Sequence, residues 1–355
     1  MRWLMIACLS LASLIGLNSC GREPLVQSQS YVFGTLVDIS IYGEPESRAR
    51  ELINHVLQDF QGLHNRLHAW QQGSELYALN EAFAKGKQPI QISDELATII
   101  QDATRLSQQS QGAFNPSIGH LIGTWGFQRD EFSPVTVEPT QIQKLLSANP
   151  QMTDIVVAQH SAYSKNPVVK LDLGGYAKGY ALDMAASYLR KQGVKNALIN
   201  IGGNIIAIGQ HGEKPWRVGI QHPRKAGPIA LLDLPDGWAI GTSGDYQRYF
   251  ELNGQRYCHI INPATGYPAQ RTQAVTILVA PSEIASGAHA GTLSDVASKP
   301  IFIAPESERG KVASMMGIQN VLLIDATGKV FVSPAMQKRL QWVEPDQQAQ
   351  TLTID

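Results

Sequence analysis

Residues 171–183, Leu-Asp-Leu-Gly-Gly-Tyr-Ala-Lys-Gly-Tyr-Ala-Leu-Asp, constrain the fold of this chain more than any other stretch. Apolar residues over 168–173 predict the end of a strand, and those that follow recur at helical spacing, which predicts a helix ending at Gly193. The glycine pair at 174–175 lets the backbone approach a ligand, because neither residue has a Cβ atom. The turn therefore offers free N–H groups and the positive end of a helix dipole, an arrangement that suits a phosphate.

Two charged side chains flank this turn. Lys178 lies in the first predicted helical turn, where its charge disfavours the helix but suits an anion. Asp172 lies on the strand side, where it could accept a hydrogen bond from a ligand or hold a loop. The glycine spacing matches neither Gly-x4-Gly-Lys-Ser/Thr nor Gly-x-Gly-x2-Gly, the common phosphate-binding motifs. A strand–Gly-Gly–helix turn is also a common packing device, so its role depends on the rest of the chain.

Length and composition set the broad class. The 355 residues are enough for one large domain or two medium ones, and 43% hydrophobic with 17% charged residues is ordinary for a globular protein. The formal net charge of -1 gives no indication of binding to nucleic acid or of electrostatic binding to a membrane surface. Helix and strand patterns are mixed without strict βαβ alternation, which predicts an α+β fold.

The first twenty residues have the pattern of an export signal. After a short basic start, residues 4–17 are almost wholly apolar, and Leu-Asn-Ser-Cys ends at Cys20. The apolar run is too short to span a bilayer and is typical of a signal peptide. Its end resembles a bacterial lipobox, whose cysteine is acylated and becomes the first mature residue. Asn18 is uncommon there, so ordinary cleavage and an uncleaved anchor are the alternatives to a signal peptide over 1–19 with a lipid-bearing cysteine.

A polar tether over residues 20–30 is expected to lead into one domain over 31–340, followed by a tail over 341–355. Apolar periodicity predicts further helices. One covers 46–67, a second begins after an N-cap at Ser93, and a third runs from about residue 285 to Pro300. The remaining patterns are those of strands. The second glycine pair predicts a β-bulge, and the Asn-Gly pair predicts a hairpin turn. The strands are expected at 31–42, 197–209 (bulged at Gly202-Gly203), 216–221, 229–234, 238–241, 248–252 and 256–261 (joined by Asn253-Gly254), 274–280, 321–324 and 330–333.

Four motifs in a fixed order carry the functional interpretation. They are residues 172–183, Asn-Ile-Gly-Gly-Asn at 200–204, Thr-Ser-Gly-Asp at 242–245, and His-Ile-Ile-Asn-Pro-Ala-Thr-Gly-Tyr-Pro at 259–268. Together they resemble the ApbE family, the FAD:protein FMN transferases, and the earlier segments 34–35, 70–80 and 112–127 match that family as well. The resemblance covers residues 31 to 335, and a lipoprotein signal is common in the family.

The resemblance implies a two-lobed α+β protein of mixed and antiparallel sheets, with FAD as substrate in the cleft between the lobes and Mg²⁺ at its pyrophosphate. Such enzymes split FAD and attach the FMN half, through a phosphoester, to a threonine or serine of a partner protein. Their partners are flavoprotein subunits of Na⁺-pumping or Rnf-type redox complexes. The implied location is the bacterial cell envelope, facing the periplasm and anchored by lipid, with the inner membrane favoured over the outer.

By position, the resemblance also assigns the flavin end of the site. An aromatic, small or amide side chain stands at each position that should contact the flavin or its ribityl chain. These positions are Phe33, Trp70, Ala113, Phe114 and Asn115.

At the phosphate end, the resemblance implies that Asp172 and Lys178 contact the nucleotide. The carbonyl of Gly175 and the carboxylate of Asp295 should ligate the metal, and hard oxygen ligands of this kind suit Mg²⁺. His259 stands where the family has a histidine beside the scissile pyrophosphate, and it could take the proton of the attacking hydroxyl.

Three positions depart from the family pattern. Asn115 and Asn262 stand where the family usually has aspartate, so hydrogen bonding is kept and charge is lost. Four residues after Asp295 the family usually has a threonine that ligates the metal, whereas this chain has Lys299, whose ammonium cannot ligate Mg²⁺. Either Ser298 or water replaces that ligand, or the lysine supplies positive charge to the FAD phosphates directly.

Two other functions fit the same motifs. An FAD pyrophosphatase would use water in place of the protein hydroxyl and release FMN and AMP. A non-catalytic flavin-binding lipoprotein would have the three departures as its signature. The products formed from FAD in the presence of an acceptor separate these hypotheses.

The first prediction concerns the amino terminus. Cys20→Ser should block processing and acylation, because the cysteine sulfur is the atom to which the lipid would be attached. Lipid labelling and the mass of the mature protein measure this. Normal labelling and cleavage in the variant would contradict a lipid anchor at this residue.

Overall fold

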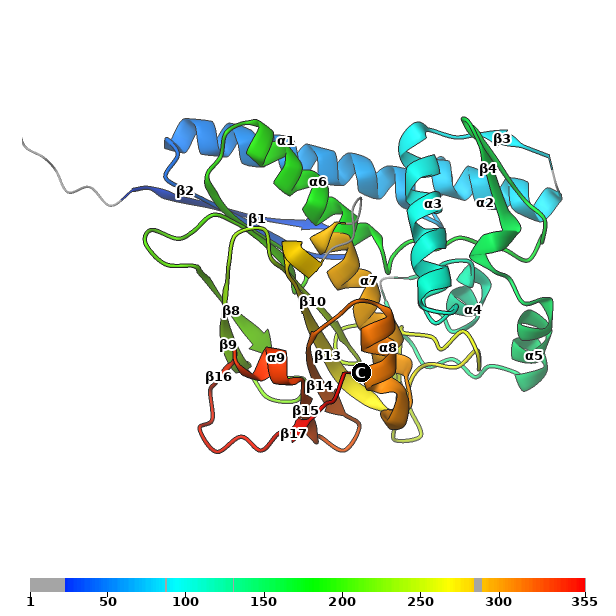
Figure 1. Cartoon of the computed structure of the whole chain (residues 1–355). Coiled ribbons are helices and arrows are strands. Elements are labelled where there is room, and N and C mark those ends of the chain that lie inside the picture. Colours follow the sequence, from blue (N-terminus) through cyan, green and yellow to red (C-terminus); the bar gives the residue numbers. More distant parts are fainter. Residues whose placement is uncertain (1–22, 87, 130, 284–288, 355) are drawn as a thin grey trace, which may run out of the picture.

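The computed structural model describes residues 23–86, 88–129, 131–283 and 289–354. Within these residues a nine-stranded sheet forms the centre of the protein, antiparallel except for its last pair (Figure 1). In spatial order its strands are β1 (Leu25–Val32), β2 (Thr35–Tyr42), β6 (Asn196–Ile201), β7 (Asn204–Ile208), β10 (Ala239–Gly244), β13 (Thr272–Val279), β14 (Asn320–Asp325), β15 (Val330–Val332) and β17 (Gln350–Thr351).

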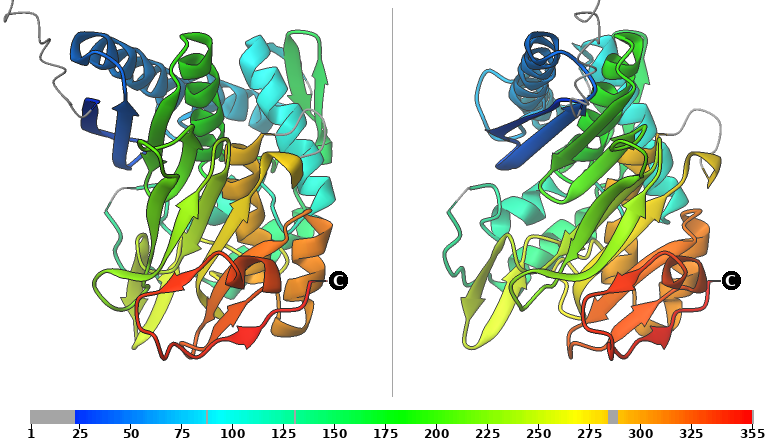
Figure 2. Two further views of the ribbon diagram at one scale, coloured as in Figure 1. Left: turned by 60° about the vertical axis from the view of Figure 1, so that its left-hand side comes forward. Right: turned by 90° about the vertical axis from the view of Figure 1, so that its left-hand side faces the viewer.

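Helices cover one face of this sheet, and a smaller sheet covers the other (Figure 2). Successive side chains of a strand point to opposite faces, so Ile277 packs with the helices whereas Leu278 packs with the small sheet. The helical layer contains α1 (Glu46–Leu67), α2 (Glu75–Lys85), α3 (Asp94–Gln109), α6 (Ala177–Lys191), α7 (Ala290–Ile303) and α8 (Arg309–Met315). The small sheet contains β8 (Trp216–Gln221), β9 (Pro228–Leu234) and β16 (Gln341–Trp342), beside α9 (Pro334–Gln337).

Two outlying groups complete the fold. A three-stranded sheet of β3 (Ile90–Gln91), β5 (Ser161–Ser164) and β4 (Ile155–Ala158) lies beyond α2 and α3. A third apolar cluster joins α4 (Gly119–Thr124), α5 (Pro139–Ala148) and the hairpin of β11 (Tyr249–Leu252) with β12 (Gln255–Cys258). No helix among the described residues is both long enough and apolar enough to cross a membrane.

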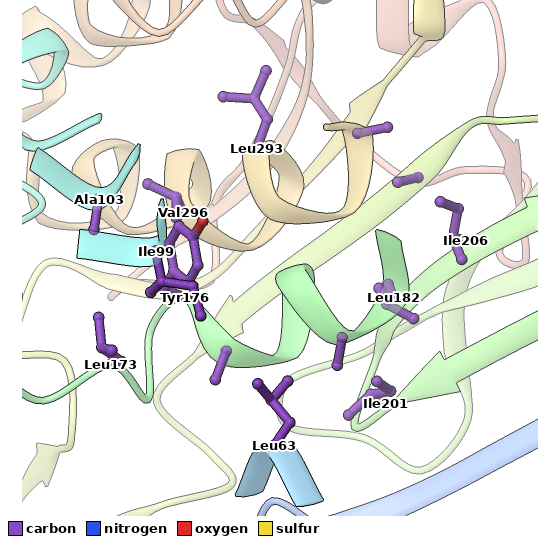
Figure 3. Close-up of a cluster of buried hydrophobic side chains, with 14 of the residues drawn as sticks. Leu63, Ile99, Ala103, Leu173, Tyr176, Leu182, Ile201, Ile206, Leu293 and Val296 are labelled. Carbon is purple, nitrogen blue, oxygen red and sulfur yellow. The ribbon is translucent and has the colours of Figure 1, made fainter. Parts of the chain in front are cut away.

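Helices α6 and α7 cross at two glycines, and this contact positions much of the core. A Cβ atom added at Gly179 would collide with the Gly291 carbonyl oxygen and would lie 2.7 Å from the Cα atom of Thr292. The two backbones therefore touch, as only glycine allows. Figure 3 shows the apolar side chains that surround this crossing, contributed by α1, α3, α6, α7 and the sheet. The labelled ones are Leu63, Ile99, Ala103, Leu173, Tyr176, Leu182, Ile201, Ile206, Leu293 and Val296.

The α+β class is confirmed, and so are the elements with strong local signals. Helix α1 has the bounds expected from its apolar stripe, and Ser93 caps α3 by accepting a hydrogen bond from Leu96 N at 3.2 Å. The hairpin turn lies at Asn253-Gly254, both with positive φ, as this residue pair favours. The division into two lobes stays a prediction.

Several of the strands expected from the sequence are wrong in the structure. The segment 197–209 is not one bulged strand but the hairpin β6–β7, because Gly202 and Gly203 both have positive φ and form its turn. In the same way 31–42 divides into a hairpin at Phe33-Gly34. No strand is found at 168–173, where an isolated bridge from Lys170 to Ile118 replaces it.

The expected ends of the domain are also corrected. Residues 25–30 belong to β1 rather than to a tether, because they pair with β2. The expected tail at 341–355 contains β16 and β17, which pair with β9 and β15. Helix α7 continues past Pro300 to Ile303, and the start expected near residue 285 lies outside the described residues. The signal peptide and Cys20 lie outside them too.

The α6–α7 crossing generates the second prediction. Gly179→Ala should lower the free energy of unfolding by about 1–3 kcal/mol, because the new methyl group has no space against α7. Gly62→Ala is the matched control, since in α1 the added Cβ would meet only the flexible end of Arg66, and alanine favours a helix by up to about 1 kcal/mol. Urea unfolding measures both. Equal stability of the two variants would contradict a tight crossing.

Candidate functional site

A cavity of about 600 Å³ opens between the β1–β2 turn, residues 113–118, the Gly-Gly turn and α7. Its lining includes every residue that the resemblance assigned to the flavin end and the phosphate end of the site, together with Lys299. These are Phe33, Trp70, Ala113, Phe114, Asn115, Asp172, Gly175, Lys178, His259, Asp295 and Lys299. The structure therefore brings together residues that are up to 266 positions apart, from Phe33 to Lys299 (299 − 33).

The Gly-Gly turn is a tight entry into α6. The Leu173 carbonyl accepts hydrogen bonds from Tyr176 N at 2.9 Å and from Ala177 N at 2.8 Å, which starts the helix. Asp172 Oδ1 accepts the N–H of Gly174 at 2.9 Å and so uses one of the free donors of the turn. The Gly-Gly turn was expected to begin a helix, and this is confirmed, although no strand precedes the turn.

Trp70 and Asp172 hold each other at the edge of the cavity. Trp70 Nε1 donates to Asp172 Oδ2 at 2.9 Å, and Lys170 Nζ lies 4.1 Å from the centre of the indole ring. Burial lowers the pKa of Lys170, against the opposing charges of Glu81 and Asp172. Of the two roles that the sequence left open for Asp172, the structure assigns it loop-holding. Its contact with a nucleotide stays a prediction.

Asp295 has both carboxylate oxygens engaged. Oδ2 accepts the N–H of Gly179, in the first turn of α6, at 3.0 Å, and Oδ1 accepts from Lys299 Nζ at 2.6 Å. Burial alone would raise the pKa of Asp295, but the charges of Lys178 and Lys299 outweigh it and hold the pKa below its usual value. The carboxylate is therefore ionised and takes the place of an N-cap for α6.

The cavity also holds two lysines of different character. Lys178, from the first turn of α6, forms no hydrogen bond or ion pair with any residue that the structure describes, so its charge is available to a ligand. Lys299 is tied to Asp295, and burial lowers its pKa against the attraction of that carboxylate. Both cations lie at the α6–α7 end of the cavity and make that end suitable for an anion.

His259 is held in one tautomer. Its Nδ1–H donates to the Arg248 carbonyl at 3.2 Å, which leaves Nε2 as the nitrogen with a free lone pair. Burial first, and then the charges of Arg248 and Lys178, lower the pKa of His259 to about 3. The ring is therefore neutral near pH 7 with the Nε2 lone pair free, and burial makes it a weak base in the free protein.

Aromatic side chains also line the cavity. Phe33 has φ +56°, an unusual value for a bulky residue, and it packs against Phe60 and His64 with ring centroids 5.9 Å and 5.7 Å away. Backbone held in this way is found at ligand sites. Phe114 is 5% exposed and lies near Gly175, so an aromatic ring adjoins the Gly-Gly turn and the stem of Lys299.

The two amides that replace aspartate hold loops. Asn115 Nδ2 donates to the Pro150 carbonyl at 3.0 Å, a bond that aspartate could not form, while its Oδ1 accepts from Ser117 N. Asn262 Oδ1 accepts from Ala264 N at 2.9 Å. The amide at position 115 is therefore explained by local structure, whereas the bond of Asn262 uses only its oxygen, which an aspartate would also offer.

Sequence reasoning missed part of the lining. Tyr31 and Leu36, beside the β1–β2 turn, line the mouth of the cavity and are 65% and 51% exposed. Arg248 lines the cavity too and orients His259. The only sequence signal for Arg248 was its place in the expected strand 248–252, which faces the expected strand 256–261 that contains His259. The first three residues of the motif at 242–245 line the cavity, whereas Asp245 forms a bidentate ion pair with Arg224.

The residues present do not fit the magnesium site that the resemblance implies. Asp295 Oδ1, the oxygen that could face a metal, is bonded to the Lys299 ammonium, and an ammonium offers no lone pair. Ser298, the alternative ligand, is buried and is hydrogen-bonded to Ser243 Oγ at 2.7 Å and to the Asp295 carbonyl at 2.8 Å. Among the residues described, no group of three or more His, Cys, Asp or Glu side chains could hold a metal ion.

Comparisons with known proteins point to one family. A family model described as the ApbE family matches residues 33–322. A FAD:protein FMN transferase of Rhodobacter capsulatus is 37% identical over 332 residues, which are 94% of this chain and 61% of that protein, so the chain spans less than two thirds of this relative. The protein of the same name from Haemophilus influenzae is 29% identical over 94% of this chain and 96% of its own length.

Solved structures agree with these relatives. The ApbE protein of Thermotoga maritima superposes with a TM-score of 0.79 at 28% identity, covering 89% of this chain and 99% of that one. The flavin transferase ApbE of Vibrio cholerae superposes with a TM-score of 0.75 at 26% identity and with the same coverage.

The environment of His259 generates the third prediction. In the unfolded chain a histidine has a pKa of about 6.5, so below that pH the unfolded state binds a proton that the folded state, with a pKa of about 3, refuses. The contribution of His259 to the free energy of unfolding should therefore be complete above about pH 6.5 and should fall as the pH is lowered toward 3. The difference between the wild type and His259→Gln in urea unfolding at pH 7 and pH 5 isolates this slope. An imidazole ¹⁵N titration of His259 with a midpoint of about 6.5 would contradict it.

Proposed function

Because the chain belongs to the ApbE family, we propose that it is a flavin transferase that takes FAD as substrate and transfers the FMN half to a protein. The acceptor group is the hydroxyl of a threonine or serine, and the bond formed is a phosphoester. The names of the relatives, FAD:protein FMN transferases, support this activity. The whole activity is proposed for this chain, since the Rhodobacter relative is longer.

One observation carries the proposal: a single cavity is lined by both aromatic and cationic side chains. FAD joins the two kinds of group that these side chains would bind, a flat apolar ring system and a pyrophosphate. Phe33 and Phe114 are the aromatic residues of the lining that the argument uses, and Lys178 and Lys299 are the cationic ones. The volume of about 600 Å³ is in the range of cofactor-sized pockets.

The chemistry follows from the positions of the side chains. The acceptor oxygen attacks the phosphorus of the FMN half, a P–O bond forms there, and the P–O bond of the anhydride breaks, so that AMP leaves with the bridging oxygen. His259 Nε2 takes the hydroxyl proton, because its other nitrogen is committed to the Arg248 carbonyl. Lys178 and Lys299 offset the charge that repels the nucleophile and that grows on the leaving AMP.

Dependence on Mg²⁺ stays a prediction of the resemblance. A bound metal would supply positive charge to the phosphates and polarise them. The residues of this site do not provide its ligands while Lys299 holds Asp295, so no step above passes through a metal. A metal titration decides the question.

The place of action is proposed from the sequence. The export signal and Cys20 support a lipid anchor on the bacterial cell envelope, with the domain facing the periplasm and the inner membrane favoured. The acceptor would then be the exposed flavoprotein subunit of a membrane redox complex of the Na⁺-pumping or Rnf type. Tyr31 and Leu36, exposed beside the mouth of the cavity, lie where such a subunit would approach.

The fourth prediction tests the activity. FAD is incubated with the protein and a candidate acceptor domain, and the products are analysed by mass spectrometry and chromatography. We expect acceptor that is heavier by one FMN, with release of AMP. Free FMN with AMP would instead indicate a pyrophosphatase, and unchanged FAD would indicate a binding protein without catalysis.

A variant locates that activity in the cavity. Lys178→Ala should weaken FAD binding by roughly tenfold or more, because a charge-assisted hydrogen bond to phosphate is lost. The midpoint of urea unfolding of the free protein should barely move, since Lys178 has no direct ion-pair partner among the described residues and Lys299 still pairs with Asp295 in the variant. Unchanged binding together with a large loss of stability would show that the turn is only structural.

A further inference from the structure

We propose that the ammonium group of Lys299 is a built-in cation that replaces the divalent metal in this site, so that FAD binds through its pyrophosphate without a metal ion. The inference rests on the proposed function in one respect, that FAD is the ligand. It goes beyond that function because it names the source of the positive charge and predicts that this chain departs from the metal dependence that the resemblance implies.

The first observation is the position of the lysine stem. Lys299 crosses directly over Gly175, the residue whose carbonyl is expected to face a metal. A Cβ atom at position 175 would lie 2.9 Å from Lys299 Cε and 3.2 Å from its Cδ, which is closer than non-bonded carbon atoms approach. The end of the Lys299 side chain therefore lies against the Gly-Gly turn, in the space that a side chain at position 175 would need.

The second observation is how the ammonium is held. Nζ donates to the Asp295 carbonyl and to Asp295 Oδ1, both at 2.6 Å. An ammonium has three N–H groups, so two of them fix its place and one is left for a ligand. The side chain of Lys299 is 18% exposed and lines the cavity, whereas that of Asp295 is 3% exposed. Both side chains therefore line the cavity, and that of Lys299 is the more exposed of the two.

The third observation is that each Asp295 oxygen already has a partner in this arrangement. Its Oδ2 accepts the N–H of Gly179, and its Oδ1 is the oxygen paired with Lys299. A divalent cation at the same place would have to displace the ammonium, which would then lie within a few ångströms of the metal charge. Repulsion between two cations so close in a site with little water disfavours joint occupancy.

A purely structural ion pair is the competing explanation. Residues 295 and 299 are four apart on α7, and exposed pairs at this spacing are common. This pair is buried, however, and a buried ion pair is a poor way to stabilise a helix, since an apolar pair of the same size does as well or better. A ligand-binding role accounts for the burial of Asp295 and for the opening of Lys299 to the cavity.

FAD affinity with and without a metal ion tests the proposal on the full-length protein. Flavin fluorescence measures FAD binding in EDTA and in MgCl₂, and Mn²⁺ electron paramagnetic resonance measures metal binding directly. For the wild type we expect FAD affinities that agree within about twofold in the two buffers. For Lys299→Thr, which supplies an oxygen ligand and removes the charge, we expect FAD binding in EDTA to weaken by roughly tenfold or more and to recover with Mg²⁺. Mn²⁺ should bind this variant, and not the wild type, when FAD is present.

The control is Lys191→Thr, at the exposed end of α6, which should leave FAD affinity unchanged in both buffers. The proposal would be overturned by wild-type affinity that falls about tenfold in EDTA, or by Lys299→Thr binding FAD in EDTA as the wild type does. The wild-type comparison stands even if the variant fails to fold. Metal-independent FAD binding without FMN transfer to an acceptor would leave this proposal standing and remove the proposed function. Absence of FAD binding to the wild type in both buffers would remove both.

Discussion

The contact on which the rest of the site depends is the crossing of α6 and α7 at Gly179 and Gly291. The missing Cβ atoms let the two backbones touch, and each helix then supplies a carboxylate to the amino-terminal end of the other. Asp183 of α6 accepts from Gly291 N at 2.8 Å and from Thr292 N at 2.7 Å, and Asp295 of α7 accepts from Gly179 N at 3.0 Å. Neither helix has a side-chain cap from its own N-cap residue, so the two helices cap one another.

This reciprocal capping decides the electrostatics of the cavity. Burial disfavours a charged carboxylate, and it raises the pKa of Asp183 despite three hydrogen bonds from α7. Asp295, buried as deeply, stays ionised because two lysines face it. The difference between the two carboxylates lies in their cations, Lys178 from α6 and Lys299 from α7. Both cations are carried to the same end of the cavity by the crossing itself.

Local sequence signals predicted the elements, whereas long-range pairing was out of their reach. The apolar stripe of α1 and the Asn253-Gly254 turn are encoded within a few residues, so they could be predicted. A glycine pair such as Gly202-Gly203 suits both a bulge and a hairpin turn, and only the partner strand decides between them. At the site, the motifs indicated which residues line the cavity. They could not indicate that Asp295 bonds to a backbone group 116 positions away, because that depends on how two helices cross.

The glycine pair that dominates the sequence has a physical role different from the one its pattern suggests. Absence of Cβ atoms predicts that backbone N–H groups approach a phosphate, but Gly174 N is bonded to Asp172 and the space above Gly175 is filled by the stem of Lys299. The glycine thus admits a side chain rather than a ligand to the backbone. A lysine at position 299 and a glycine at position 175 are consequently neighbours in the fold: the end of the long cationic side chain lies in the space that a side chain at position 175 would need. A departure from a family motif at one position therefore packs against a motif residue 124 residues earlier (299 − 175).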